Sequence, residues 1–140
     1  MSDTNAAFTI KGIQTADGER DVTELDVVGN YTRTDKGYLI EYSDYAAPEF
    51  NRTVISFNDD TLIMTKLGEI NTEMFFKEGT RTNCDYQTPY GSFEIGIFTN
   101  KLAIKADDKG ARIKLEYNID FNYGFAAVNE LDIKVIRQGE

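Results

Sequence analysis

The sequence predicts an all-β protein, an antiparallel up-and-down meander of eight to ten strands closed into a β-barrel. Apolar and polar residues alternate strictly between residues 112 and 122, which is the pattern of a strand with one buried face. Short turn sequences recur along the chain, and no stretch shows the spacing of a long amphipathic helix. A meander of this length leaves two open edges, and closure into a barrel removes them.

The chain has 140 residues, which suits a single domain spanning 1–140. Nearly every connection is short, so consecutive strands are expected to be antiparallel neighbours. The expected strands are residues 7–16, 20–32, 37–45, 51–58, 61–67, 69–78, 80–88, 91–106, 111–122 and 125–136.

The first hairpin has the clearest turn signal, an Asp-Gly pair at 17–18. A two-residue loop there pairs Ile10 with Leu25 on one face and sets Lys11 opposite Glu24 on the other. Turn chemistry and hydrophobic pattern therefore select the same register.

The next connections are also short. Residues 33–37 turn Tyr31 back onto Tyr38, and two aspartates at 59–60 join the strands on either side. Residues 45–50 break the alternation, so we expect a loop or a short lid there.

Two turns frame the seventh strand. A turn at 77–79 is expected to pair the sixth strand with the seventh and to place Met74 opposite Thr82. The Thr-Pro-Tyr-Gly sequence at 88–91 favours a type I turn, and the register that follows points Cys84 inward. A buried thiol among apolar neighbours is a small hydrophobic group with a raised pKa.

The last three strands require one irregularity. The apolar phase changes near residues 100–101, which predicts a bulge or a sharp bend. A four-residue loop at 107–110 follows, and a three-residue loop at 122–124, ended by a left-handed Gly124, sets Leu115 opposite Leu131.

Composition excludes several classes of partner and chemistry. The net charge is −9, from 24 acidic and 15 basic residues, which disfavours nucleic acid and anionic membranes as partners. No internal disulfide is possible with one cysteine, and the N-terminus lacks a signal-peptide pattern, so we expect a cytoplasmic protein. We expect no cofactor and no metal site.

The chain contains no histidine, which removes Ser-His and Cys-His catalysis and His-ligated metals. The paired aspartates in turns fit turn formation and do not match a calcium-binding loop. We therefore assign no catalytic residues and favour a non-enzymatic protein, although carboxylates and tyrosines alone can support acid–base chemistry.

The predicted inner face carries an unusual number of tyrosines. Such residues could line a cavity that holds an amphipathic ligand, or they could simply fill a small barrel. A buried amide among them needs hydrogen-bond partners, from Tyr117, from the backbone or from a ligand. The candidate ligand-binding residues are Tyr31, Tyr38, Tyr42, Tyr86, Tyr117 and Asn129.

A second candidate surface lies on the outer face. The expected registers place Arg81 between Phe75 and Phe98, both pointing outward. Exposed phenylalanines need a cover, either from the chain itself or from a second subunit. These three residues are the candidate interface of a homodimer.

Several of these motifs also resemble a known family. Gly79 with Arg81, the Gln-Thr-Pro-Tyr-Gly sequence at 87–91, Tyr117, and Asn129 with Leu131 and Ile133 look like the YwiB-like bacterial proteins, a family of unknown function in the calycin superfamily of β-barrels. The resemblance covers about residues 8–136 and implies a lipocalin-like barrel without an established reaction.

Two functions follow as hypotheses. The first is non-enzymatic binding of a small apolar or amphipathic ligand inside an intracellular barrel. The alternative is a homodimeric protein-interaction module that uses the outer face around Phe75, Arg81 and Phe98.

Overall fold

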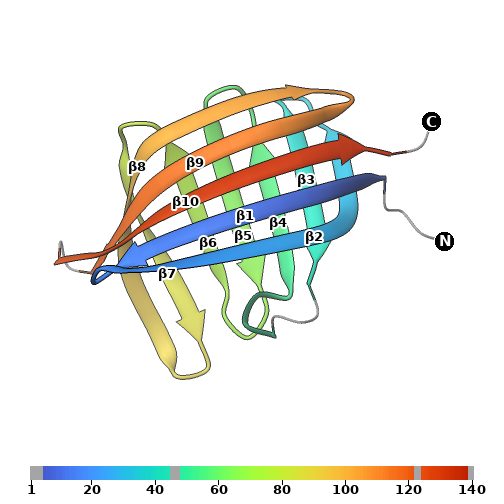
Figure 1. The fold of residues 1–140 in the computed structure, drawn as a ribbon. Coiled ribbons are helices and arrows are strands. Elements are labelled where there is room, and N and C mark those ends of the chain that lie inside the picture. Colours follow the sequence, from blue (N-terminus) through green and yellow to red (C-terminus); the bar gives the residue numbers. More distant parts are fainter. Residues whose placement is uncertain (1–4, 45–47, 122–123, 139–140) are drawn as a thin grey trace.

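The structure is a computed structural model that describes residues 5–44, 48–121 and 124–138, and these residues form ten antiparallel strands and one short 3-10 helix (Figure 1). The elements are β1 (Ala6–Ala16), β2 (Glu19–Arg33), β3 (Tyr38–Ser43), η1 (Pro48–Phe50), β4 (Arg52–Phe57), β5 (Thr61–Leu67), β6 (Thr72–Lys77), β7 (Arg81–Thr88), β8 (Gly91–Asp107), β9 (Gly110–Phe121) and β10 (Gly124–Arg137). The predicted fold class is confirmed, and each expected strand is present within about three residues of its expected ends.

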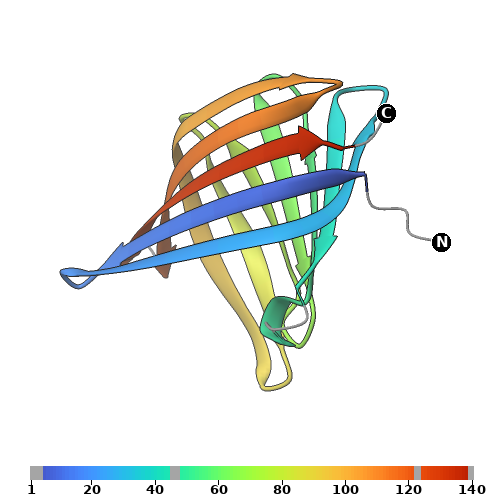
Figure 2. The ribbon, with the colours of Figure 1, turned by 45° about the vertical axis from the view of Figure 1, so that its right-hand side comes forward.

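The strands form one sheet that curves into a nearly closed barrel (Figure 2). Its order is β6-β5-β4-β3-β2-β1-β10-β9-β8-β7, so the first and last strands pair with each other. The two edges of the sheet are β6 and β7, which are consecutive in sequence. The barrel therefore has its seam in the middle of the chain and not at the termini.

The predicted register of the first hairpin is confirmed. Ile10 lies opposite Leu25 and Lys11 opposite Glu24. The φ angles of the turn residues are 52° for Asp17 and 79° for Gly18, which is the left-handed conformation that a two-residue hairpin turn requires.

The predicted bulge in β8 is also confirmed, because the register with β9 shifts between Thr99 and Lys101. Leu115 lies opposite Leu131, as expected, but the turns differ in detail. Asp107 pairs with Gly110, so that loop has two residues and not four.

The last hairpin accommodates its extra residue in a different place. Gly124 pairs with Phe121 inside the ladder, and the register shifts between Phe125 and Ala127. The predicted three-residue loop is therefore wrong, because a bulge in β10 accommodates the residue that we placed in the turn. Residues 122–123 lie outside the described residues.

The expected hairpin between β6 and β7 is wrong as well. After the turn, the chain bonds to β8: Gly79 N donates to Thr99 O at 2.8 Å, and Thr99 N donates to Thr80 O at 3.1 Å. Among the described residues, a bridge between Asn71 and Gln87, a bond from Thr82 Oγ1 to Phe75 O at 3.1 Å and one from Thr72 Oγ1 to Cys84 Sγ at 3.7 Å join the two edges. This arrangement leaves an open seam.

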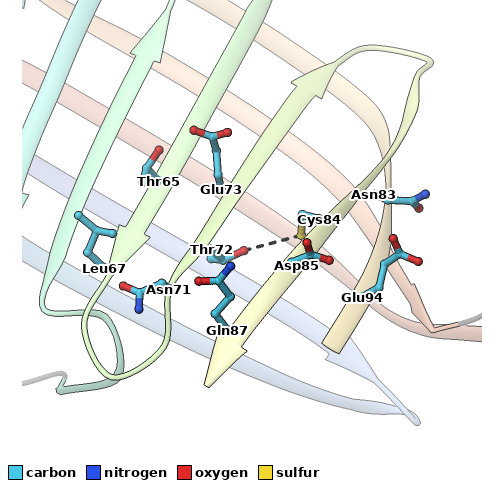
Figure 3. Close-up of a pocket in the computed structure, with 10 residues that line it drawn as sticks. All are labelled: Thr65, Leu67, Asn71, Thr72, Glu73, Asn83, Cys84, Asp85, Gln87 and Glu94. Carbon is cyan, nitrogen blue, oxygen red and sulfur yellow. Dashed lines mark hydrogen bonds between the residues drawn. The ribbon is translucent and has the colours of Figure 1, made fainter. Parts of the chain in front are cut away.

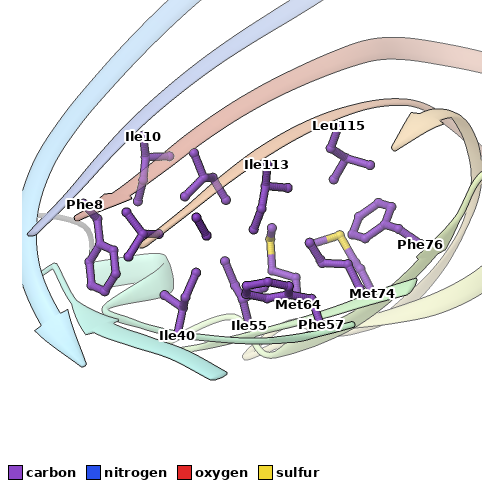
Figure 4. Packing of buried hydrophobic residues seen from close by; sticks show 14 of the residues in the cluster. Phe8, Ile10, Ile40, Ile55, Phe57, Met64, Met74, Phe76, Ile113 and Leu115 are labelled. Carbon is purple, nitrogen blue, oxygen red and sulfur yellow. The ribbon is translucent and has the colours of Figure 1, made fainter. Parts of the chain in front are cut away.

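The inner faces of the strands enclose one apolar core (Figure 4). Phe8 and Ile113 on one wall face Ile40, Ile55 and other side chains on the opposite wall, and all four are at most 1% exposed. Burying side chains of this size stabilises the fold by roughly 1.5–3 kcal/mol each.

The region expected to be a loop or lid contains η1 at Pro48–Phe50, while residues 45–47 lie outside the described residues. In the part of the chain that the structure describes, no helix has the length and apolar character needed to cross a membrane.

Candidate functional site

The first feature of the candidate site is a polar row on the inner face of the barrel. The registers align Thr99, Tyr117, Asn129 and Gln14 across β8, β9, β10 and β1, and Gln14 lies opposite Asp21 on β2. Strand alternation places Thr99, Tyr117 and Asn129 two positions from Ile97, Leu115 and Leu131 on the same face. The row adjoins the apolar core at the buried Thr99 and at Tyr117, whereas Gln14 and Asp21 at its other end are exposed.

A hollow of about 500 Å³ opens over this row, between β1, β2, β9 and β10. Its inward-facing lining includes Gly12, Gln14, Tyr117, Asn129 and Leu131. Two of the six predicted ligand-binding residues, Tyr117 and Asn129, are therefore brought together at one hollow. A volume of this size suits a small organic molecule.

The side-chain amide of Asn129 has one hydrogen-bond partner for its oxygen and none for its nitrogen among the described residues. Gln14 Nε2 donates a hydrogen bond to Asn129 Oδ1 at 3.0 Å. The Asn129 Nδ2 atom is buried and has no hydrogen-bond partner among the described residues, and the same is true of Thr99 Oγ1 in the same row. Buried polar atoms without partners are uncommon, and leaving such a donor or acceptor without a hydrogen bond costs roughly 1–3 kcal/mol.

Tyr117 forms the boundary between the polar row and the core. Its ring packs against that of Phe76, with centroids 4.8 Å apart. Burial, with smaller contributions from Tyr86 and Cys84, raises the pKa of the Tyr117 hydroxyl well above its ordinary value. The hydroxyl is therefore neutral at physiological pH and offers both a donor and an acceptor.

The two tyrosines at the opposite end of the interior have structural roles. Tyr31 and Tyr38 stack with ring centroids 4.9 Å apart, although Tyr31 lies opposite Ile40 in the ladder. Tyr31 Oη donates to Asp107 O at 2.7 Å, and Tyr38 Oη donates to Asp108 Oδ1 at 2.8 Å. These hydroxyls hold the β8–β9 turn and do not line the hollow.

Tyr42 and Tyr86 also lie outside the lining of the hollow. Tyr42 is buried against Phe8, with centroids 5.8 Å apart. Tyr86 is half-buried and meets Phe50 of η1 edge-on at 6.3 Å. Burial raises the pKa of both tyrosines. The six predicted residues therefore do not form one site.

An inward-facing lysine was missed in the sequence. Lys66 follows Leu62 and Met64 at the same phase of β5, and it pairs with Thr53 and Thr72, which are both buried. Its Nζ lies 5.3 Å from the centroid of the Phe50 ring, and burial lowers its pKa while Asp44 opposes that shift. The alternation of β5 in the sequence already indicated that Lys66 points inward.

Gln14 and Gly12 were missed for the same reason. Both share the inward phase of Phe8 and Ile10, so the pattern in β1 places them on the inner face. The polar ends of the strands share the inward phase of the apolar residues, so alternation also places polar side chains on the inner face.

A second depression lies outside the barrel at the seam (Figure 3). It has a volume of about 430 Å³, and Thr72 Oγ1 on β6 meets Cys84 Sγ on β7 at 3.7 Å on its floor. Burial raises the pKa of the Cys84 thiol, so the thiolate form is suppressed. Its rim carries Glu73, Asp85 and Glu94.

The acidic rim of this depression does not form a metal site. The described residues contain no group of three or more acidic or cysteine side chains arranged to hold a metal ion. The hydrogen-bond partner of the thiol is Thr72, which is not a base that could activate a cysteine nucleophile.

The outer candidate residues are arranged differently from the prediction. Arg81 lies opposite Phe98, as expected, but its guanidinium binds Asp120, with Nη2 to Oδ1 at 2.7 Å and Nε to Oδ2 at 3.4 Å. Phe75 pairs with Ile63 on β5 because β6 and β7 form no ladder. A carboxylate therefore binds the arginine, and Phe75 is not its partner in a ladder.

The fold and the hollow define a ten-stranded antiparallel barrel with polar side chains at one end of an apolar interior. Residues 8–133 match the family described as a domain of unknown function, DUF1934, and the chain belongs to that family. The chain is similar in structure to the YwiB protein from Bacillus subtilis, whose crystal structure superposes with a TM-score of 0.85. The two share 17% sequence identity over 97% of this chain and 93% of that chain.

At this identity the likeness shows a common fold and carries no function with it. Comparison with curated proteins gives no match.

Proposed function

We propose that this protein binds a small apolar or amphipathic molecule in the hollow of its barrel, without catalysing a reaction. The observation that carries the proposal is Asn129, which lines a hollow of about 500 Å³ and whose buried Nδ2 atom has no hydrogen-bond partner among the residues that the structure describes. A bound molecule with a polar end would satisfy this atom, and its apolar part would cover the half-buried Leu131.

The adjoining core supports the same proposal. Leu131, Ile119 and Tyr117 are inward-facing but only half-buried, although they pack against the main core cluster. Side chains of this kind gain stability when a ligand removes them from water, at roughly 25 cal/mol for each Å² of apolar surface.

Native mass spectrometry of freshly purified protein tests the proposal directly, because it reports bound molecules together with the number of subunits. We expect a population heavier than the bare chain by the mass of a small molecule. The neutral dye Nile red gives a second measurement, since its fluorescence rises in apolar surroundings.

Two variants locate the dye. Leu131→Gln places an amide on the lining of the hollow and is expected to reduce the fluorescence gain, whereas Phe98→Asp on the outer face is expected to leave it unchanged. The absence of both a bound molecule and a dye response in the wild-type protein would refute the proposed function.

A homodimer remains the second candidate, favoured by the exposed apolar residues on the outer face. Phe98 and Ile63 are each 37% exposed, and Ile63 lies beside the half-buried Phe75. Thr82 joins this strand pair to β7 next to Arg81. Light scattering should show a dimer for the wild type and a monomer for Phe98→Asp. Two monomers at micromolar concentration would exclude this candidate.

A further inference from the structure

Gly12 occupies an inward position in the middle of β1 where an apolar side chain would be expected. Glycine weakens a strand interior, and it is usually found where another backbone or a ligand comes close. At Gly29, Gly37 and Gly110, an added Cβ would overlap a backbone oxygen of the neighbouring strand, so packing alone explains those three glycines.

Packing does not explain Gly12. A Cβ there would have Thr23 Oγ1 at 3.0 Å, which is the end of a rotatable side chain, and the nearest backbone atom is 4.0 Å away. The missing side chain leaves space on the lining of the hollow, next to Leu131 and Gln14. The glycine therefore keeps the hollow open.

The hydrogen-bonding capacity of the wall is directional. Gln14 Nε2 occupies Asn129 Oδ1, so the group that Asn129 still offers is the N–H donor at Nδ2. A donor of this kind is satisfied by a carbonyl or another neutral oxygen acceptor.

The charge of the lining selects against anions. Of the described residues that line the hollow, Asp21 and Glu130 are acidic and none is a lysine or arginine. A carboxylate ligand would meet two negative charges with no cation to offset them. The inward Lys66 is not part of this lining.

We propose that the hollow binds an uncharged small molecule that presents an oxygen acceptor to Asn129 and an apolar or aromatic body to Leu131 over Gly12. This inference depends on the proposed function and adds to it the chemical class of the ligand and the residue that makes room for it.

Benzamide and benzoate form a matched pair of probes, because they have the same shape and differ in charge. Ligand-observed NMR on the full chain is expected to show binding of benzamide and about tenfold weaker binding of benzoate. In proton–nitrogen spectra, benzamide should shift the side-chain NH₂ resonances of Asn129, which are assigned by their loss in Asn129→Asp.

Two variants test the geometry. Asn129→Asp keeps the acceptor for Gln14 but removes the donor, so benzamide binding should weaken by about tenfold. Gly12→Val fills the hollow with a residue that strands favour, and it should abolish benzamide binding. Thr9→Val on the exposed face of the same strand is the control and should bind as the wild type does.

Benzoate binding that equals or exceeds benzamide binding overturns the assignment. If that benzoate binding is then lost in Lys66→Met, the carboxylate binds at Lys66 and not at Asn129. Unchanged benzamide binding in both Asn129→Asp and Gly12→Val, or no binding of either probe, overturns it as well. These results leave the proposed function intact as long as the wild-type protein still binds Nile red and Leu131→Gln does not.

Discussion

The five inward tyrosines share a periodicity but not an environment, and the partner of each hydroxyl separates their roles. Tyr31 is fully buried, and its single hydroxyl proton is shared between two backbone oxygens of the β8–β9 turn, Asp107 O at 2.7 Å and Gly110 O at 3.1 Å. Tyr117 lines the hollow, but burial raises the pKa of its hydroxyl, with smaller contributions from Tyr86 and Cys84. A hydroxyl with fixed backbone partners, such as that of Tyr31, stabilises the fold.

Replacing Tyr31 with phenylalanine tests the structural role. The variant keeps the stacked ring and leaves both turn carbonyls without this donor, so the free energy of unfolding should fall by about 1–2 kcal/mol in urea titrations. Tyr38→Phe is the matched control, because its hydroxyl binds the exposed Asp108, and its loss should be smaller. Equal losses in the two variants would contradict this assignment.

At the scale of elements, the seam between β6 and β7 is the main departure from a closed barrel. β1 and β10 have ladder partners on both sides, whereas β6 and β7 each have one. Backbone groups of an edge strand that lack a partner exchange with solvent more readily than those inside a sheet.

Hydrogen exchange should therefore separate these strands. We expect segments covering β6 and β7 to exchange faster than segments covering β1 and β10, measured by mass spectrometry of the native protein. Equal protection in all four strands would mean that a ladder closes the seam in solution.

The edge strand β7 is fastened to the sheet by an ion pair that spans β8. The Arg81 guanidinium crosses over Gly96 to reach Asp120 on β9, and Gly96 lies opposite Asp120 in the ladder. The two charged side chains are 29% and 16% exposed, so water screens the pair less than it would a surface pair.

Substituting Gly96 with alanine should disrupt the ion pair between Arg81 and Asp120. A Cβ at Gly96 would lie 2.6 Å from Asp120 Oδ1 and would overlap the guanidinium of Arg81, so we expect a loss of about 1–3 kcal/mol in stability. In the Arg81→Ala background the same substitution should cost much less, and a double-mutant cycle measures the difference. Additive losses would show that Gly96 and the Arg81–Asp120 ion pair are not coupled, and would contradict this interpretation.

At the scale of the whole molecule, turn chemistry and alternation were sufficient to predict the barrel and most of its registers. The Asp-Gly turn and the phase change near residue 100 each fix a register locally, and both are confirmed. The seam could not be predicted in this way. The turn between β6 and β7 suits a hairpin, but the residues around Thr80 form their backbone hydrogen bonds with Thr99 of β8 and not with β6.

The candidate site was predictable in part. Alternation placed Tyr117 and Asn129 on the inner face, and register brought them opposite each other. The hollow itself depends on how far the strands bend and on which side chains fill the interior, and neither property has a local signal. Gly12 gives the space, and its meaning appears only when its neighbours in three dimensions are known.

The net effect of burying so many tyrosines is a dependence of stability on alkaline pH. Burial raises the pKa of Tyr31, Tyr42, Tyr86 and Tyr117 above the ordinary value of about 10. The folded chain therefore keeps these protons at a pH at which the unfolded chain has lost them. The stabilisation is complete below about pH 10 and falls as the pH rises further.

We expect the free energy of unfolding to change little near neutral pH, because the chain has no histidine to titrate, and to fall steeply above about pH 10. The lowered pKa of Lys66 acts in the opposite direction, but it is one group against these four tyrosines, and the raised pKa values of Tyr38 and Cys84 act in the same direction as theirs. Urea titrations across this range measure the loss, and the ultraviolet absorbance of tyrosinate should rise together with unfolding. Tyr117→Phe removes one of the four groups and should make the decline shallower. If the tyrosines ionised well before the chain unfolded, the buried hydroxyls would be open to solvent and the packed interior described here would be wrong.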